Sequence, residues 1–219
     1  IRNKITPILF NNIITGNSVS LVVKKTDLKR ALNVINVEIF GQTKKINIAV
    51  FGHGLVGGTL INQVLSSAKN IEGRKGINLN IFAIANSTKL VINKSGIKEN
   101  WKEEIANEFV TYNVQDIIKY AKENHLENLI AVDNTASSGF VENYLTLIEN
   151  GFDVVSSNKI ANTLSYGFYK AIRQVLQDNQ KNYLYETNVG AGLPLIDTIK
   201  LLHLSGENIT KIKGVFSGT

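Results

Sequence analysis

INIAVFGHGLVGG, residues 46–58, decides the fold of this chain, because it leads an apolar strand into a glycine-rich turn and then into a helix. Its glycines have the spacing GxGxxG. In a dinucleotide-binding turn, the first glycine makes the tight turn, the second lets the pyrophosphate approach, and the third lets helix and strand pack closely. The N–H groups and positive dipole end of the helix then hold the phosphates. The residues expected to bind a dinucleotide here are Gly52, Gly54, Leu55, Val56 and Gly57.

The alternative is a plain tight turn, but the rest of the chain favours dinucleotide binding. Apolar strands alternate with amphipathic helices and short links, which predicts an α/β fold with a parallel, doubly wound sheet of the Rossmann type. The nearly continuous apolar strands agree, because helices cover both faces of such a sheet. Strands are expected at 46–51, 79–85, 129–132, 152–155 and 183–185, and helices at about 55–65, 113–121, 140–148 and 164–176.

Residues 1–45 follow a different pattern. Residues 18–23 alternate as a strand, and Thr26 and Asp27 suit the start of a helix. Gly41 suits its end, and the polar GQTKK that begins there is expected to be a linker. One strand and one helix cannot bury a core of their own, so we expect the tail of an upstream domain.

Composition limits the classes of function. The 219 residues include no Cys, which excludes disulfides and thiolate chemistry. The N-terminus has no secretory signal pattern, so a cytoplasmic location is expected, and no apolar run approaches the ~18 residues of a membrane span. The net charge of +6 comes from scattered lysines with no Arg-rich run, so we expect no nucleic-acid partner. A phosphate-bearing cofactor suits this charge better.

Residues after the second strand bear on the choice of nucleotide. An acidic residue there would hold the ribose 2′-OH of NAD and repel a 2′-phosphate. This strand instead ends in ANSTK, residues 85–89, without a carboxylate. Ser87 and Lys89 could accept the phosphate of NADP, so NADP is expected and NAD stays possible; an ordinary polar loop is the alternative.

Histidines carry no catalytic role in this interpretation. His53 lies at a variable position of the glycine turn and is expected near the cofactor rather than as a base. His125 and His203 follow helical stretches and are expected to be structural, and no two histidines are spaced as metal ligands.

Two further segments resemble homoserine dehydrogenases. One is VDNTAS, residues 132–137, followed by GFDVVSSNK at 151–159 and ANT at 161–163. The other is YETNVGAGLP at 185–194, with GVFSGT at 214–219. The resemblance extends over residues 46–219, and residues 1–45 look like the end of an ACT regulatory domain. It implies a bifunctional aspartokinase/homoserine dehydrogenase with domains at 1–43 (ACT-like tail and linker), 44–187 (dinucleotide-binding) and 188–219 (start of an α/β substrate and dimerisation domain).

The resemblance implies an oxidoreductase that interconverts L-homoserine and L-aspartate 4-semialdehyde with NAD(P), in threonine and methionine synthesis. A cytoplasmic homo-oligomer, a dimer or larger, is implied. The family's proton-transfer residues should lie beyond Thr219, so we assign no general base and expect this chain alone to bind cofactor without turnover. Two alternatives are a non-catalytic Rossmann/ACT regulatory module and another Rossmann dehydrogenase of a small amino-acid metabolite.

Site residues follow partly from position and partly from the resemblance. Asn134 and Thr135 leave the carboxyl end of a strand, where ligands of open α/β sheets bind, and are expected to hold the cofactor. Lys159 also follows a strand, and the matching family lysine is an active-site residue, which implies catalytic and cofactor contacts. Gly218 and Thr219 resemble the edge of the homoserine pocket. The resemblance also implies a site for a monovalent cation, Na⁺ or K⁺, at Glu186, Val189, Ala191 and Leu193, against the alternative of a structural turn.

Overall fold

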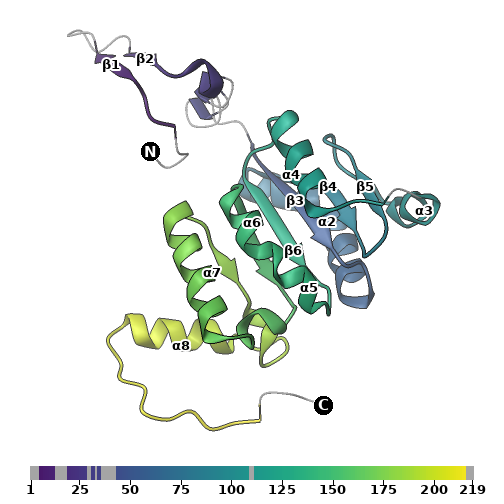
Figure 1. Cartoon of the computed structure of the whole chain (residues 1–219), viewed down its shortest axis with the longest axis vertical. Coiled ribbons are helices and arrows are strands. Elements are labelled where there is room, and N and C mark those ends of the chain that lie inside the picture. Colours follow the sequence, from purple (N-terminus) through teal and green to yellow (C-terminus); the bar gives the residue numbers. More distant parts are fainter. Residues whose placement is uncertain are drawn as a thin grey trace.

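The computed structural model describes residues 5–12, 19–28, 31–32, 34–35, 43–108 and 111–215. Strands and helices alternate along most of this length (Figure 1). The strands are β1 Leu9–Asn12, β2 Val19–Val22, β3 Lys44–Phe51, β4 Ile77–Ala85, β5 Leu90–Ile92, β6 Leu129–Asp133, β7 Phe152–Ser156 and β8 Tyr183–Leu184. The helices are α2 Leu55–Lys75, α3 Trp101–Asn107, α4 Val114–Glu123, α5 Ser138–Val141, α6 Asn143–Glu149, α7 Tyr166–Asn179 and α8 Leu195–Leu204, with 3₁₀ turns η1 Lys25–Asp27, η2 Ile160–Asn162 and η3 Glu186–Asn188.

Six strands form one sheet in the order β5-β4-β3-β6-β7-β8. The chain leaves β3 toward β4 and β5 and then returns to β6 on the other side of β3. The order of connection therefore reverses between β3 and β6, and open α/β sheets bind ligands outside the carboxyl ends of strands at such a point. The expected Rossmann-type sheet is confirmed, except that β5 pairs antiparallel to β4 at the edge.

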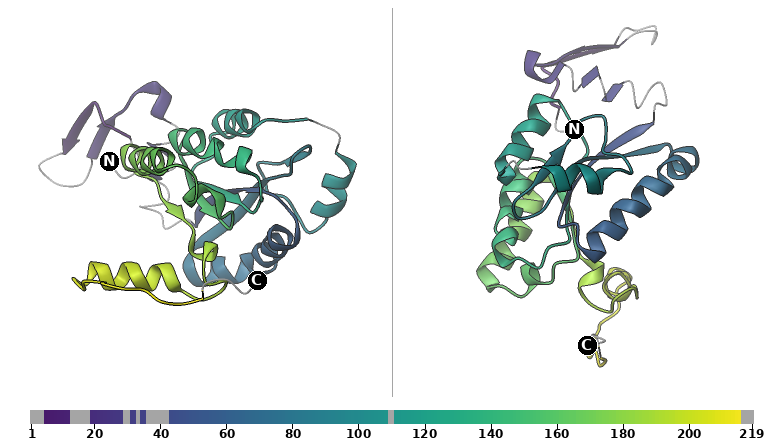
Figure 2. Two further views of the ribbon diagram at one scale, coloured as in Figure 1. Left: turned by 60° about the horizontal axis from the view of Figure 1, so that its bottom comes forward. Right: turned by 90° about the vertical axis from the view of Figure 1, so that its right-hand side faces the viewer.

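Helices cover both faces of this sheet, as Figure 2 shows most clearly in its right-hand view. On one face, α2 and α3 bury a core with Ile48, Ile84 and Trp101. On the other face, α4 and α6 pack over Phe51 and Phe82, and α6 and α7 enclose Ile172 and Tyr183 beside β7 and β8. Both faces of β3 and β4 are buried, which explains their continuous apolar sequences.

Local signals in the sequence set several helix ends. Asn113 caps α4 in a capping box, since its side chain accepts from the Asp116 N–H while the Asp116 carboxylate accepts from the Asn113 N–H. Gly76 ends α2 with a left-handed φ of 62°, which a glycine adopts without steric cost. The helix ends at Lys75, directly before this glycine, which is ten residues beyond the expected end near Leu65.

Other expectations need correction. The stripe at 140–148 is split between α5 and α6, and neither β5 nor α3 was expected. Thr26 lies within η1, and the described residues at 28, 31–32 and 34–35 after it are helical. The last residues of the expected linker, Lys44 and Lys45, already pair with β4. His203 lies inside α8 instead of following it.

The hairpin β1–β2 is separate from the six-stranded sheet, and its strands pair antiparallel with each other. The expected helix end at Gly41 lies outside the described residues, as do Gly218 and Thr219 of the expected substrate pocket. In the described part of the chain, no helix combines the length and the apolar character that a membrane crossing needs.

Candidate functional site

The glycine turn between β3 and α2 is packed so tightly that two of its positions exclude any side chain. Gly52 has a φ of +82°, and a Cβ there would lie 2.9 Å from the main-chain carbonyl of Asn134. A Cβ on Gly57 would lie 1.9 Å from the Gly52 carbonyl oxygen. Strand β3, helix α2 and the loop after β6 therefore meet here with only backbone between them.

Gly54 differs, because a Cβ at this position would meet no atom within 4 Å. It is the N-cap of α2, no side chain caps the helix, and its first turn holds no acidic residue. The next two side chains, Leu55 and Val56, are exposed. The amino end of this helix therefore presents open space and unneutralised N–H groups, which fits the phosphates of a dinucleotide.

Asn134 lies beside this turn and holds one unsatisfied buried donor. Its Oδ1 accepts a hydrogen bond from Ser157 Oγ at 3.0 Å, whereas its Nδ2 is buried without a partner within the described structure. Buried polar groups are nearly always hydrogen-bonded, so an orphaned amide calls for an explanation. A site whose hydrogen bonds a ligand completes would explain this donor.

The loop after β4 is organised by Asn86. Its Oδ1 accepts from the N–H groups of Thr88 and Lys89, and its Nδ2 lies 3.1 Å from His53 Nε2 in the glycine turn. Ser87 is exposed at this turn. Lys89 Nζ donates to the Ala106 carbonyl in the last turn of α3 at 2.6 Å. The two residues expected at a 2′-phosphate are therefore arranged differently: Ser87 is accessible, while the Lys89 ammonium is held by α3.

Tyr112 fastens this loop from the other side, because its hydroxyl donates to the Asn86 carbonyl at 2.6 Å. Burial raises the pKa of Tyr112 from 10.0 to about 12. The folded state therefore holds the phenolic proton more tightly than the unfolded chain does. Its stabilising contribution is complete below pH 10 and is lost as the pH rises toward 12.

We expect the unfolding free energy to fall by ~1–2 kcal/mol more between about pH 9 and pH 12 in the wild type than in Tyr112→Phe, a value discounted for partial exposure. The other titrating groups are common to both proteins, so the comparison isolates Tyr112. Urea unfolding at a series of pH values measures the difference. Parallel stability curves for the two proteins would show that the Tyr112 pKa is not raised.

Lys159 follows the carboxyl end of β7 and begins the 3₁₀ turn η2. Its side chain is exposed, and within the described residues its ammonium has no salt bridge or hydrogen bond. The adjoining residues connect it to the loop after β6, since Ser157 bonds Asn134 and the Asn158 amide lies 3.4 Å from Thr135 Oγ1. The structure thus brings Asn134, Thr135 and Lys159 onto two linked loops.

A buried polar cluster that the sequence interpretation missed lies under these loops. Asp133, Ser156 and Asn158 are each at most 3% exposed. The Tyr144 hydroxyl lies 2.6 Å from Asp133 Oδ2 and 2.8 Å from Ser156 Oγ. Burial, reinforced by the Asp133 carboxylate, raises the pKa of Tyr144 far above its ordinary value. The signal in the sequence was a polar residue ending each of two apolar strands, Asp133 in β6 and Ser156 in β7.

The loop after β8 contains the positions of the expected cation site. Both Glu186 carboxylate oxygens accept hydrogen bonds at the start of α8, one from the Ile196 N–H and one from the Asp197 N–H, at 2.8 Å each. The Leu193 carbonyl accepts from the Leu195 N–H at 2.8 Å. The side chain of Glu186 therefore caps α8, which leaves main-chain oxygens as the groups of this loop that could meet a cation. The described residues contain no cluster of three or more His, Asp or Glu side chains suited to a metal.

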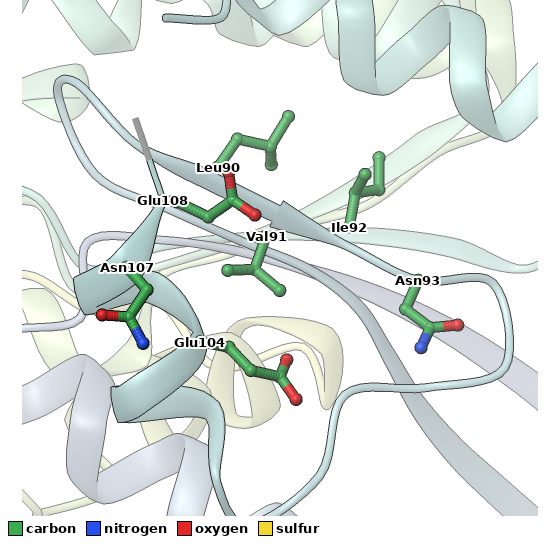
Figure 3. A pocket seen from close by; sticks show the side chains of 7 residues that line it. All are labelled: Leu90, Val91, Ile92, Asn93, Glu104, Asn107 and Glu108. Carbon is green, nitrogen blue, oxygen red and sulfur yellow. The ribbon is translucent and has the colours of Figure 1, made fainter. Parts of the chain in front are cut away.

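A hollow of about 650 Å³ lies between β5 and α3 (Figure 3). Its lining includes Leu90, Val91 and Ile92 of β5 together with Glu104 of α3 and Glu108. Two carboxylates repel a phosphate, so this hollow does not suit a dinucleotide. None of the residues expected to bind cofactor lines it.

Comparison with known proteins identifies the family of this chain. The family described as "Homoserine dehydrogenase, NAD binding domain" matches residues 52–186. The bifunctional aspartokinase/homoserine dehydrogenase of Buchnera aphidicola is 38% identical over 217 residues, which cover 99% of this chain and 26% of the relative. The chain thus spans about a quarter of the length of the curated relatives that it matches.

Solved structures share the fold. A Candida auris protein of unknown function superposes with a TM-score of 0.65 at 26% identity, covering 74% of this chain and 44% of that one. A hyperthermophilic archaeal homoserine dehydrogenase in complex with NADPH superposes with a TM-score of 0.57 at 24% identity, covering 71% and 48%. With a family match that extends from the glycine turn to Glu186, the chain belongs to the homoserine dehydrogenase NAD-binding domain family.

Proposed function

We propose that this chain is the dinucleotide-binding part of an NAD(P)-dependent homoserine dehydrogenase, which interconverts L-homoserine and L-aspartate 4-semialdehyde. The observation that carries the proposal is that Asn134 and Thr135 lie beside the glycine turn, where the sheet reverses its order of connection, and are hydrogen-bonded to the loop that contains Lys159. A module that only bound nucleotide would have no need of an exposed lysine on the linked loop whose ammonium has no partner among the described residues. Family membership supports the same assignment.

The residues of this chain would divide the work between two ends of the site. The amino end of α2 and the glycine turn hold the pyrophosphate, and Asn134 and Thr135 hold the nicotinamide half. When bound, the nicotinamide accepts or donates hydride. Lys159 carries a positive charge that can bind the substrate carboxylate or stabilise negative charge on the reacting oxygen.

We further propose that the natural protein fuses this enzyme to an aspartokinase, because the relatives that match most of the chain carry both names. Residues 1–43 would be the end of an ACT-like domain, 44–187 the dinucleotide domain, and 188–219 the start of the substrate and dimerisation domain. The exposed apolar side chains of the hairpin β1–β2 and of α8 agree with further domains on both sides. A homo-oligomeric, cytoplasmic enzyme stays a prediction.

A monovalent cation in the loop after β8 is also part of the proposal. Gly190 and Ala191 both have positive φ, 76° and 52°, which turns the main chain sharply at the expected positions. The Glu186 side chain is hydrogen-bonded to α8, so the cation would be coordinated by the main-chain carbonyl oxygens of Glu186, Val189, Ala191 and Leu193. Neutral oxygen ligands of this kind would favour a monovalent ion such as Na⁺ or K⁺.

We expect a modest preference for NADP over NAD, of ~3–10-fold, because no carboxylate follows β4 to repel a 2′-phosphate and each tenfold is about 1.4 kcal/mol. Ser87 is the accessible donor at this place, and His53 lies against Asn86 beside it. Fluorescence titration with NADPH and NADH measures the ratio. NADH binding tenfold tighter than NADPH would overturn the preference while leaving the dinucleotide site in place.

The activity is tested on the complete natural protein. We expect L-homoserine to drive the reduction of NADP⁺, followed by the absorbance of the reduced nicotinamide. Reduction with another small amino-acid alcohol and none with homoserine would identify a different dehydrogenase. Tight NADPH binding without any substrate-dependent turnover would instead favour a nucleotide-sensing module.

A further inference from the structure

Asn158 is the residue in which the loops after three neighbouring strands meet. It is 3% exposed and lies directly before Lys159. Its Nδ2 lies 3.0 Å from Asp133 Oδ2 and 3.1 Å from the Ser137 carbonyl, so it reaches the loop after β6 at both ends. This side chain therefore spans the loop that contains Asn134 and Thr135.

The main chain of Asn158 is held just as completely. Its N–H donates to Ser156 Oγ at 2.9 Å, and its carbonyl accepts from Ser156 Oγ at 3.1 Å and from Asn188 Nδ2 at 3.2 Å. The Asn158 Oδ1 accepts the Ile160 N–H at 3.0 Å, which fixes the turn that begins at Lys159. Every polar group of this residue has a partner, and those partners lie at the ends of β6 and β7 or in the segments that follow β6, β7 and β8.

Asp133 shows why an amide is required at this position. Its Oδ1 accepts the Thr135 N–H at 2.7 Å, and its Oδ2 faces the Tyr144 hydroxyl and the Asn158 amide. A carboxylate that is 1% exposed needs donors, and removing one leaves a costly unsatisfied group. Asn158 thereby stabilises the same carboxylate that shapes the turn at Thr135.

We propose that Asn158 is a positioning residue, which sets the places of Asn134, Thr135 and Lys159 relative to the glycine turn. The proposal rests on the assignment of these three residues to the dinucleotide site. A structural role alone would lower stability and leave the affinity of the folded protein unchanged, whereas a positioning role changes affinity through the loop after β6.

The test measures the NADPH dissociation constant by fluorescence, well below the unfolding midpoint of each variant. We expect Asn158→Ala to weaken NADPH binding by ~10-fold, since a hydrogen bond to a charged group is lost and its loops relax. In an Asn134→Ala background the same change should weaken binding by less than it does in the wild type, because one of the groups that Asn158 positions is already missing. Ser156→Ala is a second variant, for use if Asn158→Ala fails to fold. It removes the hydroxyl that holds the Asn158 main chain and also contacts Tyr144, and it should weaken binding ~3-fold.

Asn47→Ala is the matched control. Asn47 is equally buried, bonds Asn80 and the Glu127 carbonyl, and lies in the amino half of β3, away from the site. This variant should lose stability and keep its affinity. If Asn158→Ala behaves like Asn47→Ala, or if its effect simply adds to that of Asn134→Ala, Asn158 is not a positioning residue. Wild-type NADPH binding that Gly54→Val abolishes would show, in that event, that the proposed dinucleotide site itself stands.

Discussion

Gly54→Val should abolish NADPH binding, raising the dissociation constant by at least ~100-fold, equivalent to ~2.7 kcal/mol. The structure makes this an informative substitution, because a Cβ at Gly54 meets no protein atom within 4 Å and its φ is −63°. The valine side chain would thus fit the protein but occupy the space through which the pyrophosphate approaches α2. Titration of the folded variant with NADPH, and separately with NADH, measures the loss.

Gly73→Val serves as the control for this prediction. Gly73 lies in the same helix, near its other end, and a Cβ there also meets no atom within 4 Å. The Gly73→Val variant should therefore bind NADPH as the wild type does. Equal affinities in Gly54→Val and wild type would mean that the glycine turn does not hold the pyrophosphate.

Lys159→Ala should lower kcat/KM for homoserine by at least ~100-fold in the complete natural protein, which corresponds to ~2.7 kcal/mol of lost transition-state stabilisation. A fixed ammonium near the substrate stabilises a carboxylate in the ground state and the developing negative charge on the reacting oxygen in the transition state. The Lys159 ammonium is exposed and unpaired within the described residues, so its removal leaves no protein group without a partner. A large kinetic effect would thus report on the substrate and not on the fold.

The kinetic constants separate two roles for Lys159. A loss mainly in KM indicates that it binds the carboxylate, and a loss mainly in kcat indicates that it acts on the reacting oxygen. Lys119→Ala, which removes an exposed lysine paired 3.9 Å from Glu123 on α4, should leave both constants unchanged. Near-normal homoserine oxidation by Lys159→Ala would make Lys159 an ordinary surface residue.

Sequence reasoning predicted the sheet well because its central strands β3, β4 and β6 are largely buried on both faces and therefore mainly apolar. It missed β5 and α3, because three residues and seven residues are too few to show a clear period of apolar positions. Trp101 places α3 on the structure by packing its ring against the α2 amino end near Gly58 and donating to Asn62, contacts between distant segments that no local pattern encodes.

The site was predictable in part, for a similar reason. Gly52 and Gly57 have backbone requirements that a motif records directly. The polar cluster of Asp133, Tyr144 and Asn158 joins three different elements, so its members are unremarkable in isolation and gain meaning only after packing. The Lys89 ammonium was expected at a phosphate, but it donates to α3, an element that the sequence analysis did not anticipate.

The pairing of β3 with β6 has a consequence for how the chain folds. Strands β3 and β4 are joined through α2 alone, whereas Asn47 reaches Glu127 across 80 positions. Closing so long a loop costs entropy before any contact rewards it, so we expect the β3–α2–β4 unit to form early and β6 to dock late. Asn134 follows β6, so the nucleotide would bind only chains in which β6 has already paired with β3. Cofactor present during refolding would therefore shift the equilibrium toward this paired state.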